Sequence, residues 1–314
     1  MPTLRQLSYL VALSETGHVG RAAERMGVTQ PTLSAQIAEL ERKLGVSLAE
    51  RGRGGAMLTQ IGRETALRAR DILRAVEELK DHAAGARTGL AGTLRLGVLP
   101  TIGPYLLPRV LPGLHARYPE LRLYVREDFP APLEQGLLDG RFDLLMISLP
   151  VAQGGIATAP LFREELMLAV PGDHPAGGKA RMPRDGMKGE KVLALETGHR
   201  YHTQVRDLCE ELGAELLPDY EGTSLDTLRQ MTAMGAGLTF LPALYVHSEV
   251  GSRRAEADGG ADIAITRLGP RPPVRVVGLA WRRTAADQTG YAEMAALIRT
   301  RMADLALPGV STTV

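Results

Sequence analysis

The stretch Val19–Leu44, VGRAAERMGVTQPTLSAQIAELERKL, holds two short helical patterns separated by Gly27 and Val28. In the first pattern, Ala22 and Ala23 are small enough for a second helix to cross closely. Gly27 relieves the backbone at the sharp turn between the two patterns. The stretch therefore predicts a helix-turn-helix.

The second helix is expected to bury one face and to leave the other in solvent. Its apolar residues recur at spacings of three and four, and we expect a buried stripe of Leu33, Ile37, Leu40 and Leu44. In a DNA-binding helix-turn-helix, the N-terminal side chains of this helix face base edges in the major groove, where glutamine can pair bidentately with adenine. The predicted DNA contacts are Arg21, Thr29, Gln30, Pro31, Thr32, Ser34 and Gln36. An ordinary helical hairpin with a polar first turn is the alternative.

The sequence GVSLAERGRGGAMLT, residues 45–59, follows this helix and predicts a two-stranded wing. Arg51 and Arg53 lie near its tip, where arginine is favoured for contacts with phosphates or with a narrow minor groove. Residues 1–63 contain eight Lys and Arg against five Glu. This modest local excess suits a surface that binds the phosphate backbone.

Residues 4–62 resemble the winged DNA-binding domain of the LysR-type transcriptional regulators. The family motifs AA, TQPTLS, LE..LG..L.ER and LT..G occur here in order, although Ala49 stands where the family usually has a larger apolar residue. The resemblance implies a regulator that binds a pseudo-palindromic site in double-stranded DNA as a homodimer or homotetramer. An activator of this type also contacts RNA polymerase.

The composition is that of a globular protein with two or three domains: 314 residues, 44% hydrophobic, with a formal net charge of +1. The N-terminus lacks a basic segment followed by an apolar run, so we expect a cytoplasmic protein that does not contact a membrane. The single cysteine, Cys209, excludes an internal disulfide and a cysteine-based zinc site. We expect no metal and no cofactor.

The expected domains are a winged helix-turn-helix at 1–58, a linker helix at 59–84, a hinge at 85–92, an effector domain at 93–306 and a frayed tail at 307–314. The linker has an apolar stripe made of Ile61, Ala69, Ile72, Leu73, Val76, Leu79 and Ala83. We expect this helix to pair with its twin in a dimer. The alternative is a helix packed on its own domain.

From residue 93, strand and helix patterns alternate, which predicts an α/β domain with a parallel sheet and crossover helices. The predicted strands include LMLAV (166–170) and LTFLPALYV (238–246). The number of units is too high for one small sheet. Two subdomains in the arrangement of periplasmic binding proteins fit, the first from 93–165 and 268–306 and the second from 166–267. The LysR-type resemblance implies the same effector domain and continues to about residue 306.

Ligands of open parallel sheets bind beyond the carboxyl ends of the strands. That rule selects four loops, with candidate effector-binding residues Thr101, Ile102, Ser148, Thr197, His199, Arg200 and Thr223. Helix capping is the alternative for any hydroxyl in these loops, and it is the role expected of Ser224.

The stretches LPTIGPYLLP (99–108) and ALETGHRYHTQVRDLCEELG (194–213) resemble the peroxide-sensing OxyR branch of the family. That branch has a reactive cysteine directly after a GH pair. The resemblance implies that Arg200 occupies the reactive position here and that Cys209 occupies the resolving one. A threonine that the branch uses near its reactive site falls on Pro130 here, whereas Thr101 matches the branch. The resemblance therefore adds Pro130 to the effector-binding candidates.

A helix over 201–212 would place Cys209 on its apolar face, with Tyr201, Val205, Leu208 and Leu212. A thiol in apolar surroundings is normally inert because its pKa is raised. The neighbouring Arg200, His202 and Arg206 would favour a thiolate if that helix moved. Arg200 itself suits either an anionic effector or an ordinary exposed surface position.

The favoured function is a DNA-binding regulator whose effector domain responds to a small ligand or an oxidant. The alternative is a peroxide sensor that acts through the single Cys209. An enzyme is not expected, because GxSxG, HExxH and Walker patterns do not occur. A solute-binding protein would leave residues 1–84 without a role.

Overall fold

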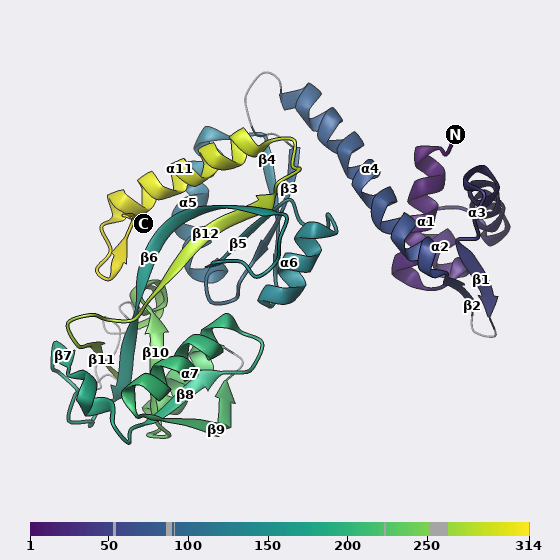
Figure 1. Ribbon diagram of the computed structural model, residues 1–314. Helices are drawn as coiled ribbons and strands as arrows, with labels where there is room; N and C mark the ends of the chain where they lie inside the picture. Colours follow the sequence, from purple (N-terminus) through teal and green to yellow (C-terminus); the bar gives the residue numbers. More distant parts are fainter. Residues whose placement is uncertain (53–54, 86–89, 91, 223, 251–262, 314) are drawn as a thin grey trace. The chain divides into compact units, whose positions relative to one another are not determined.

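The computed structural model describes residues 1–52, 55–85, 90, 92–222, 224–250 and 263–313. These residues belong to two compact units, Met1–Thr88 and Gly89–Val314 (Figure 1). Each unit is built around its own hydrophobic core. We therefore describe the two units separately.

The N-terminal unit is a small helical domain with a hairpin. Its elements are α1 (Leu4–Thr16), α2 (Val19–Arg25), α3 (Gln30–Leu44), β1 (Ala49–Gly52), β2 (Gly55–Leu58) and α4 (Gln60–Gly85). Strands β1 and β2 pair antiparallel, as the predicted wing requires. Leu33, Ile37 and Leu40 are buried as expected, but Leu44 is 39% exposed. That expectation was wrong because Leu44 is the last helical residue, and Gly45 turns the chain away in a left-handed conformation (φ 72°).

Helix α4 packs on its own domain only in part. Ala66 and Ala69 are buried in the core of the N-terminal unit, against α1. Further along the helix, Ile72 is 48% and Leu79 is 66% exposed. The helix therefore combines an anchored first half with apolar side chains that this unit does not cover.

The first half of the C-terminal unit contains three parallel strands in the order β4-β3-β5. Its elements are β3 (Gly92–Val98), α5 (Gly103–Arg117), β4 (Leu121–Glu127), α6 (Pro130–Leu138) and β5 (Leu144–Leu149). The chain passes outward from β3 to β4 and then back across to β5. Because crossovers are right-handed, α5 and α6 cover opposite faces of the sheet (Figure 1).

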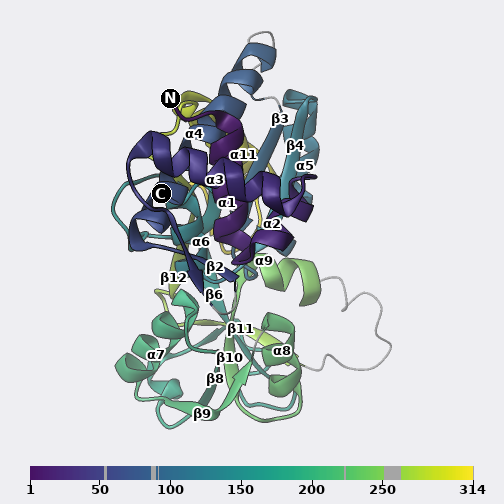
Figure 2. The same ribbon diagram turned by 90° about the vertical axis from the view of Figure 1, so that its right-hand side faces the viewer.

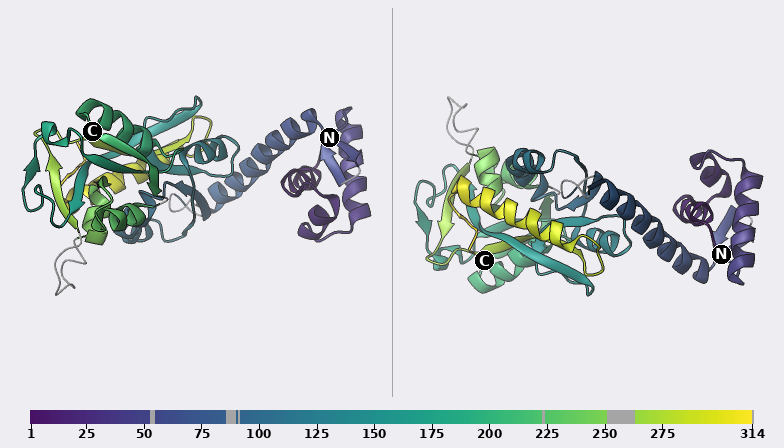
Figure 3. Two further views of the ribbon diagram at one scale, coloured as in Figure 1. Left: turned by 90° about the horizontal axis from the view of Figure 1, so that it is seen from below. Right: turned by 90° about the horizontal axis from the view of Figure 1, so that it is seen from above.

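Two later elements complete this half. Strand β12 (Val274–Arg282) adds antiparallel beside β5. Helix α11 (Gln288–Leu305) packs against α5 and β6, and Figure 3 shows it lying along the unit.

The second half repeats the same plan with the order β10-β8-β9. Its elements are β7 (Arg181–Met182), η1 (Arg184–Met187), β8 (Lys191–Leu195), α7 (Arg200–Leu212), β9 (Glu215–Gly222), α8 (Leu225–Ala233), β10 (Leu238–Pro242), α9 (Ala243–Tyr245), η2 (Val246–Val250) and β11 (Ile263–Leu268). Figure 2 shows α7 and α8 on opposite sides of these strands.

One strand, β6 (Ile156–Pro171), joins the two halves. Its first part pairs with β12, and its last part pairs with β10 and β11, in each case antiparallel. The predicted α/β class is confirmed, and the predicted parallel pairing holds for β4-β3-β5 and for β10-β8-β9. It does not extend to β6 and β12, which run antiparallel to the strands beside them. Each of these two strands follows the preceding strand of the chain without a crossover helix, which parallel neighbours would require.

Two local expectations also need correction. The tail does not simply fray, because β13 (Val310–Ser311) pairs with β6. The strand predicted over 238–246 ends at Pro242, where the chain turns into α9. Within the described ranges, no helix is long and apolar enough to cross a membrane.

Candidate nucleic-acid interface and regulatory site

The turn between α2 and α3 presents the start of α3 to solvent. Gly27 adopts a φ of 65°, a conformation that glycine tolerates without strain. The Thr29 side chain caps α3 by accepting a hydrogen bond from the Thr32 amide, at 3.4 Å. Pro31 lies in the first turn of α3, where no amide donor is needed. The cap fixes where the helix begins and leaves its first side chains exposed.

The predicted DNA contacts fall into two groups by exposure. Thr29, Gln30, Pro31 and Thr32 are exposed, whereas Ser34 and Gln36 are half-buried. A helix N-terminus that presents polar side chains in this way can enter a major groove. The structure therefore brings these predicted residues together at one end of α3.

Two cations of the N-terminal unit have neutral partners. Arg21 is exposed, and its Nη2 donates to the Thr16 carbonyl at 2.9 Å. Arg63 donates to the Leu58 carbonyl at 2.7 Å. Because carbonyls carry no charge, both guanidinium groups keep a net positive charge for phosphates. In the predicted wing, Arg51 lies in β1, and Arg53 lies outside the described residues.

Farther along α3, two cations are compensated by one carboxylate. Glu39 accepts hydrogen bonds from Arg42 at 2.6 and 2.9 Å, and Lys43 lies 3.7 Å from Glu39. The Arg42 hydrogen bond lowers the pKa of Glu39, and Glu39 in turn raises the pKa of Arg42. These charges therefore contribute less to phosphate binding than the formal count suggests.

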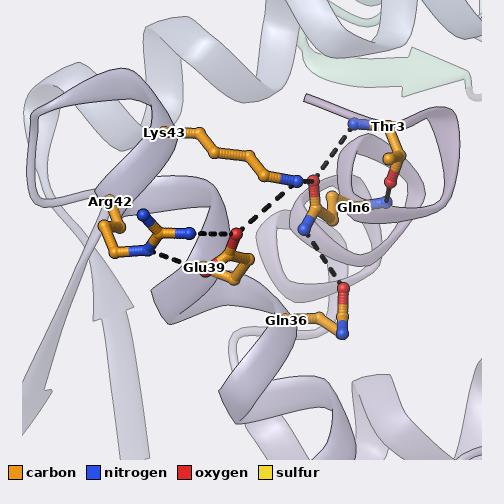
Figure 4. Close-up of polar contacts among 6 residues, drawn as sticks. All are labelled: Thr3, Gln6, Gln36, Glu39, Arg42 and Lys43. Atoms are coloured by element: carbon orange, nitrogen blue, oxygen red, sulfur yellow. Dashed lines mark hydrogen bonds and ion pairs between the residues drawn. The ribbon is translucent and has the colours of Figure 1, made fainter. Parts of the chain in front are cut away.

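The side-chain amide of Gln6, on α1, forms hydrogen bonds with two residues of α3 (Figure 4). Gln6 is buried, and its Nε2 donates to Gln36 Oε1 at 3.2 Å. Gln6 Oε1 accepts from Lys43 Nζ and from the Thr3 amide, each at 3.1 Å. Sequence analysis missed Gln6 because a lone glutamine in an amphipathic helix has no local signal that it is buried.

In the C-terminal unit, Thr101 is part of a buried network. Arg275 donates to Thr101 Oγ1 and to the Thr101 carbonyl, both at 2.8 Å. The same guanidinium donates to Glu164 at 2.8 Å, and Glu164 accepts from the Leu244 amide at 3.0 Å. Ile102, directly after Thr101, is fully buried. This network connects the β3–α5 loop to β6 and α9.

Two of the other predicted loops meet at the start of α7, together with the residue that precedes α6. The Arg200 guanidinium donates to the Pro150 carbonyl, two residues after the half-buried Ser148. The His199 ring lies 4.5 Å from the Phe129 ring, centroid to centroid, and Phe129 directly precedes α6. His199 is buried, and burial lowers its pKa.

The remaining candidates are placed as follows. Thr197 is exposed, and Pro130, the first residue of α6, is half-buried. Thr223 lies outside the described residues. Ser224 caps α8 by accepting from the Thr227 amide at 3.2 Å, which confirms the predicted capping role.

Cys209 lies on the inner face of α7, as predicted, with Tyr201, Val205, Leu208 and Leu212 also buried there. Burial raises the pKa of the thiol from 9.0 to about 11. The thiolate is therefore scarce at neutral pH, which disfavours nucleophilic attack on an oxidant. Among the described residues, no group of three or more His, Cys, Asp or Glu could hold a metal ion.

The chain matches two family models. Residues 4–63 match the bacterial regulatory helix-turn-helix protein model of the LysR family, and residues 87–303 match the LysR substrate binding domain. It is 39% identical over 299 residues to the DNA-binding transcriptional dual regulator OxyR of Escherichia coli K12, covering 95% of each chain. It is 37% identical over 305 residues to a probable hydrogen peroxide-inducible genes activator of Streptomyces viridosporus, covering 97% of this chain and 96% of the relative.

Solved structures agree with this assignment. A full-length OxyR variant from Pseudomonas aeruginosa matches with a TM-score of 0.75 at 33% identity, covering 95% of this chain and 98% of that one. A hydrogen peroxide-bound mutant of Corynebacterium glutamicum OxyR matches with a TM-score of 0.66 at 29% identity, covering 98% and 95%. The chain therefore belongs to the LysR family of bacterial helix-turn-helix transcriptional regulators and is closely related to OxyR.

Proposed function

We propose that this regulator reads a pseudo-palindromic DNA site through the first turn of α3. One observation carries the proposal: Thr29, Gln30, Pro31 and Thr32 are all exposed at a capped helix N-terminus. Glutamine and threonine side chains there can form hydrogen bonds with base edges. Arg21 and Arg63 support the proposal as phosphate contacts.

A gel-shift experiment tests this proposal. Gln30→Ala or Ser34→Ala should weaken binding to the preferred duplex by about 1–3 kcal/mol, the value of a good base contact. Gln230→Ala is the matched control, because Gln230 is an exposed glutamine of the C-terminal unit. If Gln30→Ala and Ser34→Ala bind the preferred duplex as tightly as Gln230→Ala does, the α3 surface is rejected as the reading element.

We further propose that α4 pairs with the α4 of a second copy in a homodimer or homotetramer. The exposed Ile72 and Leu79 are seven residues apart, the spacing at which helices pair. Leu79→Glu should shift the protein to a smaller species in size-exclusion chromatography. It should also weaken DNA binding, because each copy would then engage one half-site alone. An unchanged elution volume would exclude this helix as the contact.

For the effector, we propose a small anion that binds near the start of α7, with Arg200 as its counter-charge. The convergence of Arg200, His199, Phe129 and Pro150 supports this site. Mass spectrometry of molecules retained by the purified protein would identify a candidate. Titration of that molecule against the wild type and Arg200→Ala should show weaker binding to the variant, and equal affinities would remove Arg200 from the site.

A thiol sensor based on Cys209 is the weaker alternative, because the thiol is buried and its pKa is raised. We propose a structural role for Cys209. Cys209→Ser should leave any response of DNA binding to peroxide as it is in the wild type. We propose that the chain acts in the cytoplasm, where bacterial DNA lies, and that it catalyses no reaction.

A further inference from the structure

The orientation of the Gln6 amide follows from its partners. The two groups that approach one end of this amide are the Thr3 backbone N–H and the Lys43 ammonium, each 3.1 Å away. Both are hydrogen-bond donors without an accepting lone pair. The Gln6 atom between them must therefore be the carbonyl oxygen, and the Gln6 NH2 group must lie at the other end.

That orientation determines the orientation of Gln36. The Gln6 NH2 group lies 3.2 Å from the Gln36 side chain and can only donate. The Gln36 atom that faces it must therefore be Oε1. Figure 4 shows the result, with the Gln36 oxygen directed at Gln6 and the Gln36 nitrogen turned away. The Thr3 amide and the Lys43 ammonium thus fix the orientation of the Gln6 amide, which in turn fixes that of Gln36.

Gln36 lies on the same ridge of α3 as the exposed hydroxyls of the first turn. It follows Thr32 by four residues, and residues at this spacing are neighbours on a helix surface. Thr32 in turn follows the N-cap, Thr29, by three residues. The hydroxyls of Thr29 and Thr32 are 2.8 Å apart. Gln36 therefore continues the surface that, in the proposed function, faces DNA.

We propose that Gln6 is a positioning residue that makes Gln36 read DNA as a hydrogen-bond donor. This inference rests on the proposed function. Adenine pairing needs the oxygen and the nitrogen of a glutamine together, and here the oxygen is held by Gln6. Guanine presents two acceptors and no donor in the major groove, N7 and O6, whereas thymine presents one acceptor beside a methyl group. Guanine is therefore the base that best suits the outward NH2 group of Gln36.

The test begins with selection of duplexes from a pool with a randomised central stretch, using the full-length wild type. Gln6→Glu keeps an acceptor for Thr3 and Lys43 but cannot donate, so Gln36 should turn its oxygen outward. The preference at one position of each half-site should then change from guanine to a base with an amino donor, cytosine or adenine, by about tenfold. Gln6→Leu removes the constraint and should relax the preference at that position.

Gln36→Glu gives an independent reading, because it leaves the buried Gln6 intact. The new carboxylate accepts from Gln6 and presents an acceptor outward, so its preference should change in the same direction as that of Gln6→Glu. Gln230→Glu adds the same charge on α8 and should keep the wild-type preference. Thermal unfolding of each variant shows which ones fold.

The two ideas fail in different ways. A wild type that selects no duplex would reject the proposed function. A wild type that selects a site, with the same base preference retained in Gln36→Glu, would reject this inference alone. A folded Gln6→Glu that keeps the wild-type preference would also reject this inference alone. If Gln6→Glu does not fold, an unchanged preference in Gln6→Leu has the same meaning.

Discussion

Helices α3 and α7 begin in similar ways and end up in different surroundings. Both are amphipathic, and both start with polar residues. The first turn of α3 is capped by Thr29 and stays in solvent. At the start of α7, His199 is buried against Phe129, and Arg200 donates to the Pro150 carbonyl. The first turn of α3 is therefore open to a large partner such as DNA, whereas at the start of α7 only part of the turn stays exposed, including Arg200, which suits the small effector proposed above.

The largest loss of stability is expected on the buried face of α3. Leu33 is fully buried, so Leu33→Ala should destabilise the N-terminal unit by about 2–5 kcal/mol. Leu44→Ala is the matched control on the same helix, because Leu44 is already exposed and should lose far less. Urea unfolding followed by gel shift measures both, and equal losses would show that burial does not separate the two leucines.

The pH dependence of stability tests whether the Cys209 thiol on α7 is shielded from water. Because burial raises the pKa of Cys209 to about 11, the thiolate forms more readily in the unfolded chain. The thiol's contribution is fully present below about pH 9 and is lost as the pH rises toward 11, by up to about 2 kcal/mol. Unfolding free energies of the wild type and Cys209→Ala, measured across this range, should converge at high pH. Parallel curves would mean that the thiol is solvated.

The cap of α3 should contribute a smaller amount. Thr29→Ala removes the oxygen that accepts from the Thr32 amide and should cost the N-terminal unit about 1 kcal/mol. Thr65→Ala is the control, because Thr65 is inside α4 and its hydroxyl donates to the Ile61 carbonyl instead of capping a helix start. Chemical denaturation compares them, and a Thr29→Ala variant as stable as the wild type would mean that the cap contributes nothing.

The smallest effect is expected at the start of α7. Arg200 is exposed, so the loss of its bond to the Pro150 carbonyl in Arg200→Ala should change the stability of the C-terminal unit by less than about 1 kcal/mol. Arg206→Ala, on the same helix and paired with the exposed Asp207, should behave alike. A much larger loss for Arg200→Ala alone would mean that this contact holds the two halves of the unit together.

Local signals predicted most of the fold. The repeat of Leu33, Ile37 and Leu40 and the turn at Gly27 were enough for the helix-turn-helix, because these signals depend on neighbouring residues only. Strand β6 was predicted only over 166–170. Its first part, from Ile156, contains Thr158, Arg163 and Glu164, and it becomes a strand by pairing with β12, more than a hundred residues away in sequence.

The candidate sites divide in the same way. The exposed residues at the start of α3 follow from helix periodicity and capping. The contacts of Thr101 with Arg275, of Arg275 with Glu164 and of Gln6 with Lys43 join segments that are 174, 111 and 37 residues apart. Such pairs depend on the packed tertiary structure, and one sequence without its relatives carries no trace of them.

The continuity of β6 has a thermodynamic consequence for the C-terminal unit. Its backbone amides and carbonyls are shared between β12 on one side of the midpoint and β10 and β11 on the other. Unfolding of either half removes backbone hydrogen-bond partners from β6, so the two halves should unfold together. A calorimeter should accordingly record one heat-absorption peak for residues 89–314, beside a separate one for the DNA-reading unit.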